Sequence, residues 1–227
     1  MQPYFLPYIG YYQLIAAVDA FVVYDNIKYT KKGWINRNRM LVAGSVKTFS
    51  LPLKGAADSL QIVQREIAAD FQPQKLLNQI KAAYARAPGL AQTLPLLERI
   101  IGNRCLNLFG FLRESILATS AHLALDTRII TSSTIAIDHE LKGQDKVIAL
   151  CQALGADTYV NAIGGVDLYS RDDFRDCGID LKFIRAQPFE YAQDGDEFVP
   201  WLSIVDVLMR NPLDVVRWHV NNSYGIA

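Results

Sequence analysis

The chain has 227 residues, of which 51% are hydrophobic and 20% charged, as in an ordinary globular protein. Its 23 basic and 23 acidic residues cancel, which excludes an overall field that would hold it on a nucleic acid or an anionic membrane. Three widely spaced cysteines exclude a small disulfide framework and a zinc site of standard spacing, and no apolar run approaches the roughly 18 residues of a membrane span. With no signal-peptide pattern at the start, these features predict one cytoplasmic domain over residues 1–227.

The first elements predict a parallel pair of strands. Residues 1–9 are apolar and aromatic, contain two prolines, and indicate the end of a buried strand that runs into a turn. A short helix is expected over residues 10–18, followed by an apolar strand at 20–24 that Asp25 and Asn26 close. Strand, helix, strand implies a right-handed crossover, and parallel strands are buried on both faces, which suits runs without polar alternation.

The rest of the chain alternates between helices and short strands. Residues 27–39 predict a loop, and residues 40–53 a hairpin that turns at 43–45. Apolar spacings of three and four predict helices from 73 to about 125, with breaks near 88–89 and 102–103. Further strands are expected at 128–130, 158–160 and 181–184, and further helices at 144–154 and 201–209. This order predicts an α/β fold, a Rossmann-like, mostly parallel sheet with a central helical insertion or cap at about 73–125.

The loop at 27–39 carries the clearest functional pattern. It holds five basic residues and no acidic one, interleaved with aromatic and asparagine side chains. Positive charge and fork-shaped donors suit phosphate, and a tryptophan can stack on a base or sugar ring. The loop follows Asp25 at the carboxyl end of an expected strand, where ligands of open α/β sheets bind. The alternative is a solvated loop whose tryptophan packs on the core. The residues concerned are Lys28, Tyr29, Lys31, Lys32, Trp34, Asn36, Arg37, Asn38 and Arg39.

The opening segment is a second candidate for ligand contact. Gly10 stands at the start of the first helix, where the absence of a side chain would let a phosphate approach backbone N–H groups. The same segment contains Gln2, Tyr8 and Tyr11. Aromatic core packing is the alternative explanation for these tyrosines.

Two later segments follow expected strands. Asn161, Gly164 and Gly165 would bring backbone against a ligand, and a plain tight turn is the alternative. The hydroxyl run that includes Ser133 is typical of a cap or turn, and a catalytic role is the alternative. The three histidines are isolated, so no metal site is expected, and the standard serine-hydrolase, P-loop and dinucleotide-binding motifs do not occur.

Four segments together resemble the WbqC-like protein family. They are QPYFLPYIGYYQLI, DAFVVYDNIKYTKKGWINRNR, ALGADTYVNAIGGVDLY and FVPWLSIVDVLM, and they lie in the family's order from residue 2 to residue 209. The resemblance implies a bacterial protein among functions that build O-antigen and other surface polysaccharides. It implies a nucleotide-activated sugar as substrate, with transfer of an acyl or aminoacyl group to an amino sugar. Family members usually carry apolar residues before the Gln-Pro pair, so either the start lies upstream of Met1 or the first strand is short.

A second similarity connects the first crossover with the HxGH region of nucleotidylyltransferases. Tyr8 and Tyr11 stand where those enzymes have histidines. The serine-threonine run at 132–134 resembles their later motif, without the arginine expected after it. Phenols do not replace histidines that stabilise a transition-state phosphate, so the similarity implies shared topology with altered chemistry.

The resulting hypothesis is a transferase of nucleotide-sugar metabolism. In it, Lys31, Lys32 and Arg37 bind diphosphate, Trp34 stacks on a ring and Asn36 orients that ring.

Asp25 and Lys32 are the catalytic candidates of this hypothesis. Asp25 would act as general base beside the lysines, and its pKa must rise for that role. The sequence indicates no cofactor. Two alternatives stay open: nucleotidyl transfer from a magnesium nucleoside triphosphate, and a non-catalytic subunit that recognises a nucleotide sugar for a partner enzyme.

Overall fold

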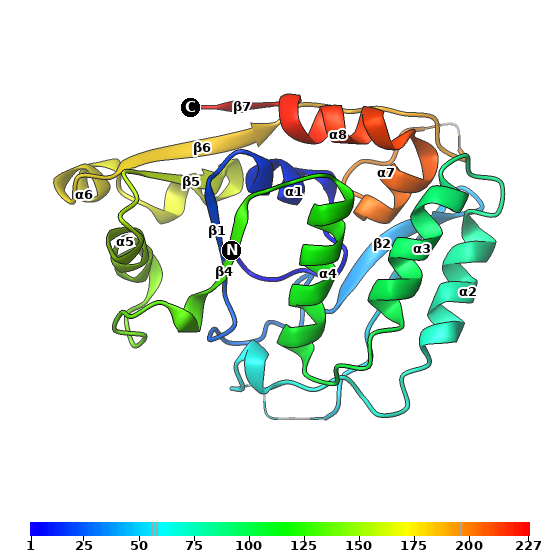
Figure 1. Cartoon of the computed structure of the whole chain (residues 1–227), viewed down its shortest axis with the longest axis horizontal. Coiled ribbons are helices and arrows are strands. Elements are labelled where there is room, and N and C mark those ends of the chain that lie inside the picture. Colours follow the sequence, from blue (N-terminus) through cyan, green and yellow to red (C-terminus); the bar gives the residue numbers. More distant parts are fainter. Residues whose placement is uncertain (56, 58, 196) are drawn as a thin grey trace.

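The computed structural model describes residues 1–55, 57, 59–195 and 197–227, and its fold is mixed α/β. In Figure 1, α2 (Pro73–Ala83), α3 (Leu90–Ile101) and α4 (Leu108–His122) stand side by side at one end of the molecule. α5 (Gly143–Leu154) and α6 (Arg171–Asp176) lie at the other end. No helix within the described ranges is long and apolar enough to cross a membrane.

The opening segment supplies one residue of strand pairing. Residues 1–8 run as irregular chain into α1 (Ile9–Ala16). Met1 N donates to Val22 O at 2.7 Å, and Met1 O accepts from Tyr24 N at 2.9 Å, the pattern of a parallel pair. The prolines of this segment have no N–H to extend a ladder, so the first strand is shorter than the sequence predicts.

β1 (Ala20–Val23) pairs in parallel with β4 (Arg128–Thr131), with Ala20 opposite Arg128. Both strands form where the apolar runs predict them. Because the carboxyl ends of parallel strands meet at one edge, residues that follow β1 come beside residues that follow β4. Positions 107 apart in the sequence become hydrogen-bonded neighbours there.

The predicted hairpin is present as β2 (Arg37–Val42) and β3 (Ser45–Ser50), but it begins inside the segment 27–39 that the sequence predicts to be a loop, because residues 37–39 pair with β3. Its two turn residues, Ala43 and Gly44, have positive φ angles of 48° and 74°, as a two-residue turn of type I′ requires. A Cβ on Gly44 would also lie 2.9 Å from Asp194 O, so this position requires glycine for two reasons.

Helices fill the range predicted to be helical, and they share the main hydrophobic core with α1 and β1. Leu77, Leu97 and Ile116 each lie inside this core, one on each of α2, α3 and α4. Gly89 precedes α3 and touches α7 (Ile204–Arg210), where a Cβ would meet Leu208 O at 2.1 Å.

The C-terminal part holds a three-stranded sheet in the order β5 (Thr158–Ala162), β6 (Asp180–Ala186), β7 (Tyr224–Ile226). β5 and β6 are parallel and β7 is antiparallel. A smaller second cluster, around Phe174 and Leu181, fills the space between this sheet, α5 and α6. The remaining elements are α8 (Leu213–Asn222) and the 3₁₀ helices η1 (Ile62–Gln64), η2 (Ser132–Thr134) and η3 (Ile163–Leu168).

A single Rossmann-like sheet is not confirmed. Within the described residues, the strands form three small sheets: β1–β4, β2–β3 and β5–β6–β7. β1 and β5 line a common groove of about 480 Å³, and Met1 also lines it. Met1 pairs with β1, but the irregular backbone that follows Met1 forms no further strand hydrogen bonds with β1. The two parallel pairs, β1–β4 and β5–β6, lie in separate sheets.

Candidate functional site

A cavity of about 870 Å³ lies between the opening segment and residues 139–169, and we call it the main cavity. Tyr8 and Gly10, at the start of α1, line it from one side, and Lys142 and Gly143, at the start of α5, line it from another. Helix N-termini carry partial positive charge and unpaired N–H groups, which favour anions. The volume is that of a small-molecule site.

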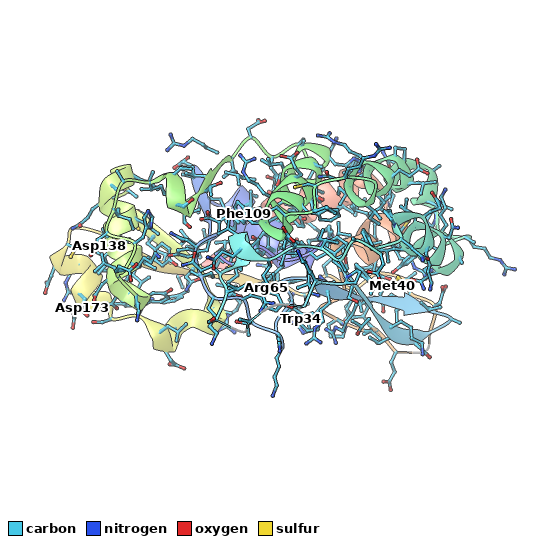
Figure 2. All side chains as sticks on the ribbon, turned by 90° about the horizontal axis from the view of Figure 1, so that it is seen from below. Trp34, Met40, Arg65, Phe109, Asp138 and Asp173 are labelled. Carbon is cyan, nitrogen blue, oxygen red and sulfur yellow. The ribbon has the colours of Figure 1, made fainter. Side chains whose placement is uncertain are left out.

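The main cavity brings together residues that the sequence analysis selected from separate segments. Figure 2 shows Trp34 in the middle of the lower edge of the molecule, between Asp138 and Asp173 at one end and Met40 on the other side. The selected residues that line the cavity are Gln2, Tyr8, Gly10, Tyr11, Lys28, Trp34, Asn161, Gly164 and Gly165. The selected residues outside its lining are Asp25, Tyr29, Lys31, Lys32, Asn36, Arg37, Asn38, Arg39 and Ser133.

Three lysines and one carboxylate supply the charged side chains of the main cavity: Lys28, Lys142, Lys146 and Glu140. Lys146 is only 6% exposed, and its Nζ donates to His139 O at 3.0 Å. It pairs with none of the carboxylates that the structure describes. An ammonium has three donors, so Lys146 keeps two for a ligand. A buried cation without a counter-ion is costly, so this wall of the cavity favours an anion.

Asp25 forms a buried polar cluster with the serines that follow β4. Its Oδ1 accepts from Ser133 N at 3.0 Å and lies 2.8 Å from Ser132 Oγ, and its Oδ2 accepts from Ser133 Oγ at 2.6 Å. Burial raises the pKa of Asp25, but the hydrogen bonds from Ser133 and Ser132 outweigh it, and the pKa lies below its ordinary value. The raised pKa that the general-base hypothesis requires is not found.

The cluster continues from Asp25 toward the main cavity. Ser132 Oγ lies 2.7 Å from Asn26 Oδ1, and Asn26 Nδ2 lies 2.9 Å from His139 Nδ1. Because Asn26 Nδ2 is a donor, His139 Nδ1 accepts, and its Nε2 donates to Ile135 O at 3.1 Å. The backbone of His139 in turn accepts from Lys146. Asp25 is therefore connected to the buried lysine through three other side chains.

Three polar residues of the segment 27–39, which we call the basic loop, form hydrogen bonds that stabilise the fold of this segment. Arg37 donates to the carbonyl oxygens of Gly33 and Lys32 at 3.1 and 2.9 Å. Asn36 bonds Tyr29 and Leu51.

Asn38, only 5% exposed, donates to the carbonyl oxygens of Phe5 and Leu6. Lys31 and Lys32 lie exposed on the loop.

Close side-chain packing explains Gly10 and Gly165 but not Gly164, where a Cβ would have no neighbour within 4 Å. A Cβ on Gly10 would lie 2.3 Å from Tyr8 Cε2, and a Cβ on Gly165 would lie 2.5 Å from Asn161 Nδ2. Tyr11 is 2% exposed and donates its hydroxyl to Gln2 O at 3.0 Å. These contacts give the cavity wall its shape.

Sequence reasoning missed several cavity residues, notably Asn26, His139, Lys142 and Lys146. Each is unremarkable along the chain: Lys142 lies just before the predicted helix at 144–154, Lys146 lies in its first turn, and the histidine is isolated. A signal was available in the position of Lys146, one turn into a helix among apolar residues. Within the described part of the chain, no three His, Cys, Asp or Glu side chains gather as metal ligands.

Comparison with known proteins agrees with the resemblance of the four segments. The model of the WbqC-like protein family matches residues 2–217. The uncharacterized protein Rv1507c of Mycobacterium tuberculosis is 26% identical over 213 residues, which are 92% of this chain and 90% of that protein. No solved structure matches the chain.

Proposed function

The chain belongs to the WbqC-like protein family, and we propose that its main cavity binds the phosphate groups of a nucleotide sugar for a transferase reaction. The expected reaction is transfer of an acyl or aminoacyl group to an amino sugar, in the synthesis of a surface polysaccharide. The sugar amine attacks the acyl carbon of the donor, the bond from that carbon to the leaving group breaks, and the proton that the amine loses passes to the departing group.

The observation that carries the proposal is the environment of Lys146. It is a buried ammonium on a cavity wall with one backbone carbonyl as partner. Lys28 and Lys142 line the same cavity, together with the first turn of α5. A phosphate would satisfy the remaining donors with charge-assisted hydrogen bonds and use the helix N-terminus as well.

Asp25 acts in this proposal as a positioning residue. Its carboxylate is held by two serines and is linked through Asn26 and His139 to Lys146. Lys31 and Lys32 are exposed and lie outside the lining of the main cavity, and the contacts of Arg37 and Asn36 favour a role in loop structure.

Titration calorimetry of the purified chain with uridine, guanosine and thymidine diphosphates and their sugars tests the proposal. Lys146→Met keeps the side-chain volume and removes the charge. We expect it to weaken binding by about 2 kcal/mol, roughly tenfold to a hundredfold, as loss of a charged hydrogen bond does.

Lys32→Met is the matched control, because Lys32 is an exposed lysine outside the cavity lining. We expect it to keep the wild-type affinity. The reverse result, with binding lost in Lys32→Met and kept in Lys146→Met, would move the phosphate site to the basic loop. Binding only of magnesium nucleoside triphosphates would favour nucleotidyl transfer, and tight binding without turnover until a partner is added would favour the non-catalytic subunit.

A further inference from the structure

A smaller pocket of about 220 Å³, which we call the aromatic pocket, shares part of its wall with the main cavity. Tyr4, Tyr8 and Trp34 line both, and Trp201 and Arg39 line the aromatic pocket. A ligand held by its phosphates in the main cavity can therefore extend over these aromatic rings.

Trp201 is held in a strained and exposed position. Its φ of 59° is in the left-handed region, which bulky side chains rarely adopt, and its side chain is 62% exposed. Its carbonyl oxygen accepts from Arg39 Nη2 at 3.1 Å, and Ser203 two residues later donates its hydroxyl to Leu6 O at 2.7 Å. Backbone contacts thus fix a strained residue whose ring the core does not use, and such strain collects at ligand sites.

The rings of Tyr8 and Trp201 stand nearly at right angles and form a corner; they do not lie parallel to each other. Trp201 and Tyr8 have ring centres 5.6 Å apart and planes at 75°. The Arg39 guanidinium lies 5.3 Å from the centre of the Trp34 ring, and its Nε is buried without a hydrogen-bond partner among the described groups. A flat nucleobase is best held between parallel faces. A sugar ring has an apolar face and a rim of hydroxyls, which fit an aromatic corner with polar edges and a guanidinium.

We propose that the aromatic pocket binds the sugar ring of the nucleotide sugar whose phosphates occupy the main cavity, with Trp201 as a specificity-determining residue. This inference rests on the proposed function and adds the place of the sugar within the site. Trp201 is separated from the other wall residues Tyr8 and Trp34 by more than 160 positions, and the loop geometry before α7 brings it to them.

The test compares each nucleotide sugar with its matching nucleoside diphosphate by calorimetry. In the wild type we expect the sugar to tighten binding by roughly tenfold, the order of one good aromatic contact. Trp201→Ala removes this increment and leaves the affinity for the diphosphate unchanged. Trp218→Ala is the matched control, because Trp218 is 59% exposed on α8, outside both cavities, and it keeps both affinities. Trp201→Asn, which tolerates the left-handed conformation, repeats the measurement without the strain of an alanine.

Two results would overturn the inference and leave the proposed function standing: equal wild-type affinities for diphosphate and nucleotide sugar, or an equal loss of both in Trp201→Ala and Trp201→Asn. If the wild type binds neither ligand, the proposed function fails and this inference fails with it.

Discussion

At Asp25, burial and hydrogen bonding act on the carboxyl in opposite directions. Burial alone would raise the pKa of Asp25, and the donors of Ser132 and Ser133 reverse that effect. A carboxylate whose two oxygens both accept hydrogen bonds is a poor proton acceptor, but it holds the groups that donate to it in place. Asp25 follows β1 and bonds the serines that follow β4, so it holds the ends of these two strands together. A general base in an open cavity would not have this structural role.

Replacing Asp25 with asparagine tests this role. The amide nitrogen would face the donors of Ser133, so we expect a loss of about 1–3 kcal/mol in the free energy of unfolding, the cost of a broken buried hydrogen-bond cluster. Because the folded pKa of Asp25 lies below its ordinary 3.8, its contribution is present above that pH and is lost as the pH falls through the folded pKa. The stability difference between wild type and Asp25→Asn therefore shrinks in acid, measured by urea unfolding.

Asp167→Asn, at an exposed position of η3, serves as the control and changes little. A variant Asp25→Asn that unfolds like the wild type but no longer turns over substrate would return Asp25 to the catalytic role. A positioning role also predicts weaker nucleotide binding, because the link from Asp25 ends at Lys146.

For single residues, the sequence indicated which residues lie near a cavity better than it indicated what each of them does. Trp34 and Tyr8 line both cavities, where a ligand could reach them. Arg37 was chosen for phosphate because a guanidinium fits it, yet in the fold the same donors bond the carbonyls of its own loop. Composition tells which groups can bind an anion, but local backbone geometry decides whether they are already engaged.

At the scale of elements, the predicted helices and strands are mostly present near the expected bounds. Periodicity identified α2, α3, α4 and α5, and uninterrupted apolar runs identified β1, β4, β5 and β6. Three of the described α-helices and strands were missed: α6 has six residues, β7 has three and is partly exposed, and α8 has ten, of which only Val216 and Val220 are buried. These elements are stabilised by packing on elements that are distant in the sequence. A local sequence pattern carries no information about such contacts.

The contact between α3 and α7 gives a prediction at this scale. Gly89 N donates to Met209 O at 2.9 Å, and a Cβ there would meet backbone atoms of α7 at 2.1 and 3.0 Å. Backbone cannot rotate away as a side chain can, so Gly89→Ala should push the helices apart. We expect a loss of about 1–3 kcal/mol, typical of overpacking, in chemical denaturation.

Gly225→Ala is the matched control, because a Cβ on Gly225 would have no neighbour within 4 Å and its φ is not positive. It should leave the unfolding midpoint nearly unchanged. Equal stability of Gly89→Ala and wild type would mean that α3 and α7 can separate at no cost, contrary to their shared core.

At the scale of the whole molecule, the sequence predicted the class of fold but neither the division of its sheets nor the location of its cavity. Both depend on how the opening segment lies against residues 139–169, more than 100 positions away. A local sequence pattern does not encode a contact between segments so far apart in the chain. The prediction of a mostly parallel sheet followed from apolar runs and their alternation with helices. Strand pairing also depends on backbone donors, which the prolines of the first eight residues lack.

Met1 lies where the parts of the molecule meet, since it lines both the groove beside β1 and the main cavity. In a chain that begins at Met1, burial lowers the pKa of the amino group from 8.0 to about 5. Between these values the unfolded chain binds the proton and the folded chain does not, so the free energy of unfolding rises with pH across this window and levels off above about 8. Three pKa units correspond to on the order of 4 kcal/mol at most.

Urea unfolding from pH 5 to pH 8.5 of the free and the Nα-acetylated chain measures this effect. Burial lowers the pKa of His122 and of His219 as well, so both chains gain stability as the pH rises, and the informative quantity is the difference between them. Acetylation removes the titrating group but keeps one N–H donor for Val22 O, so the acetylated chain should have the shallower slope, and its lead in stability should be largest near pH 5. Parallel slopes would mean that the amino group leaves β1 and stays hydrated in the folded chain.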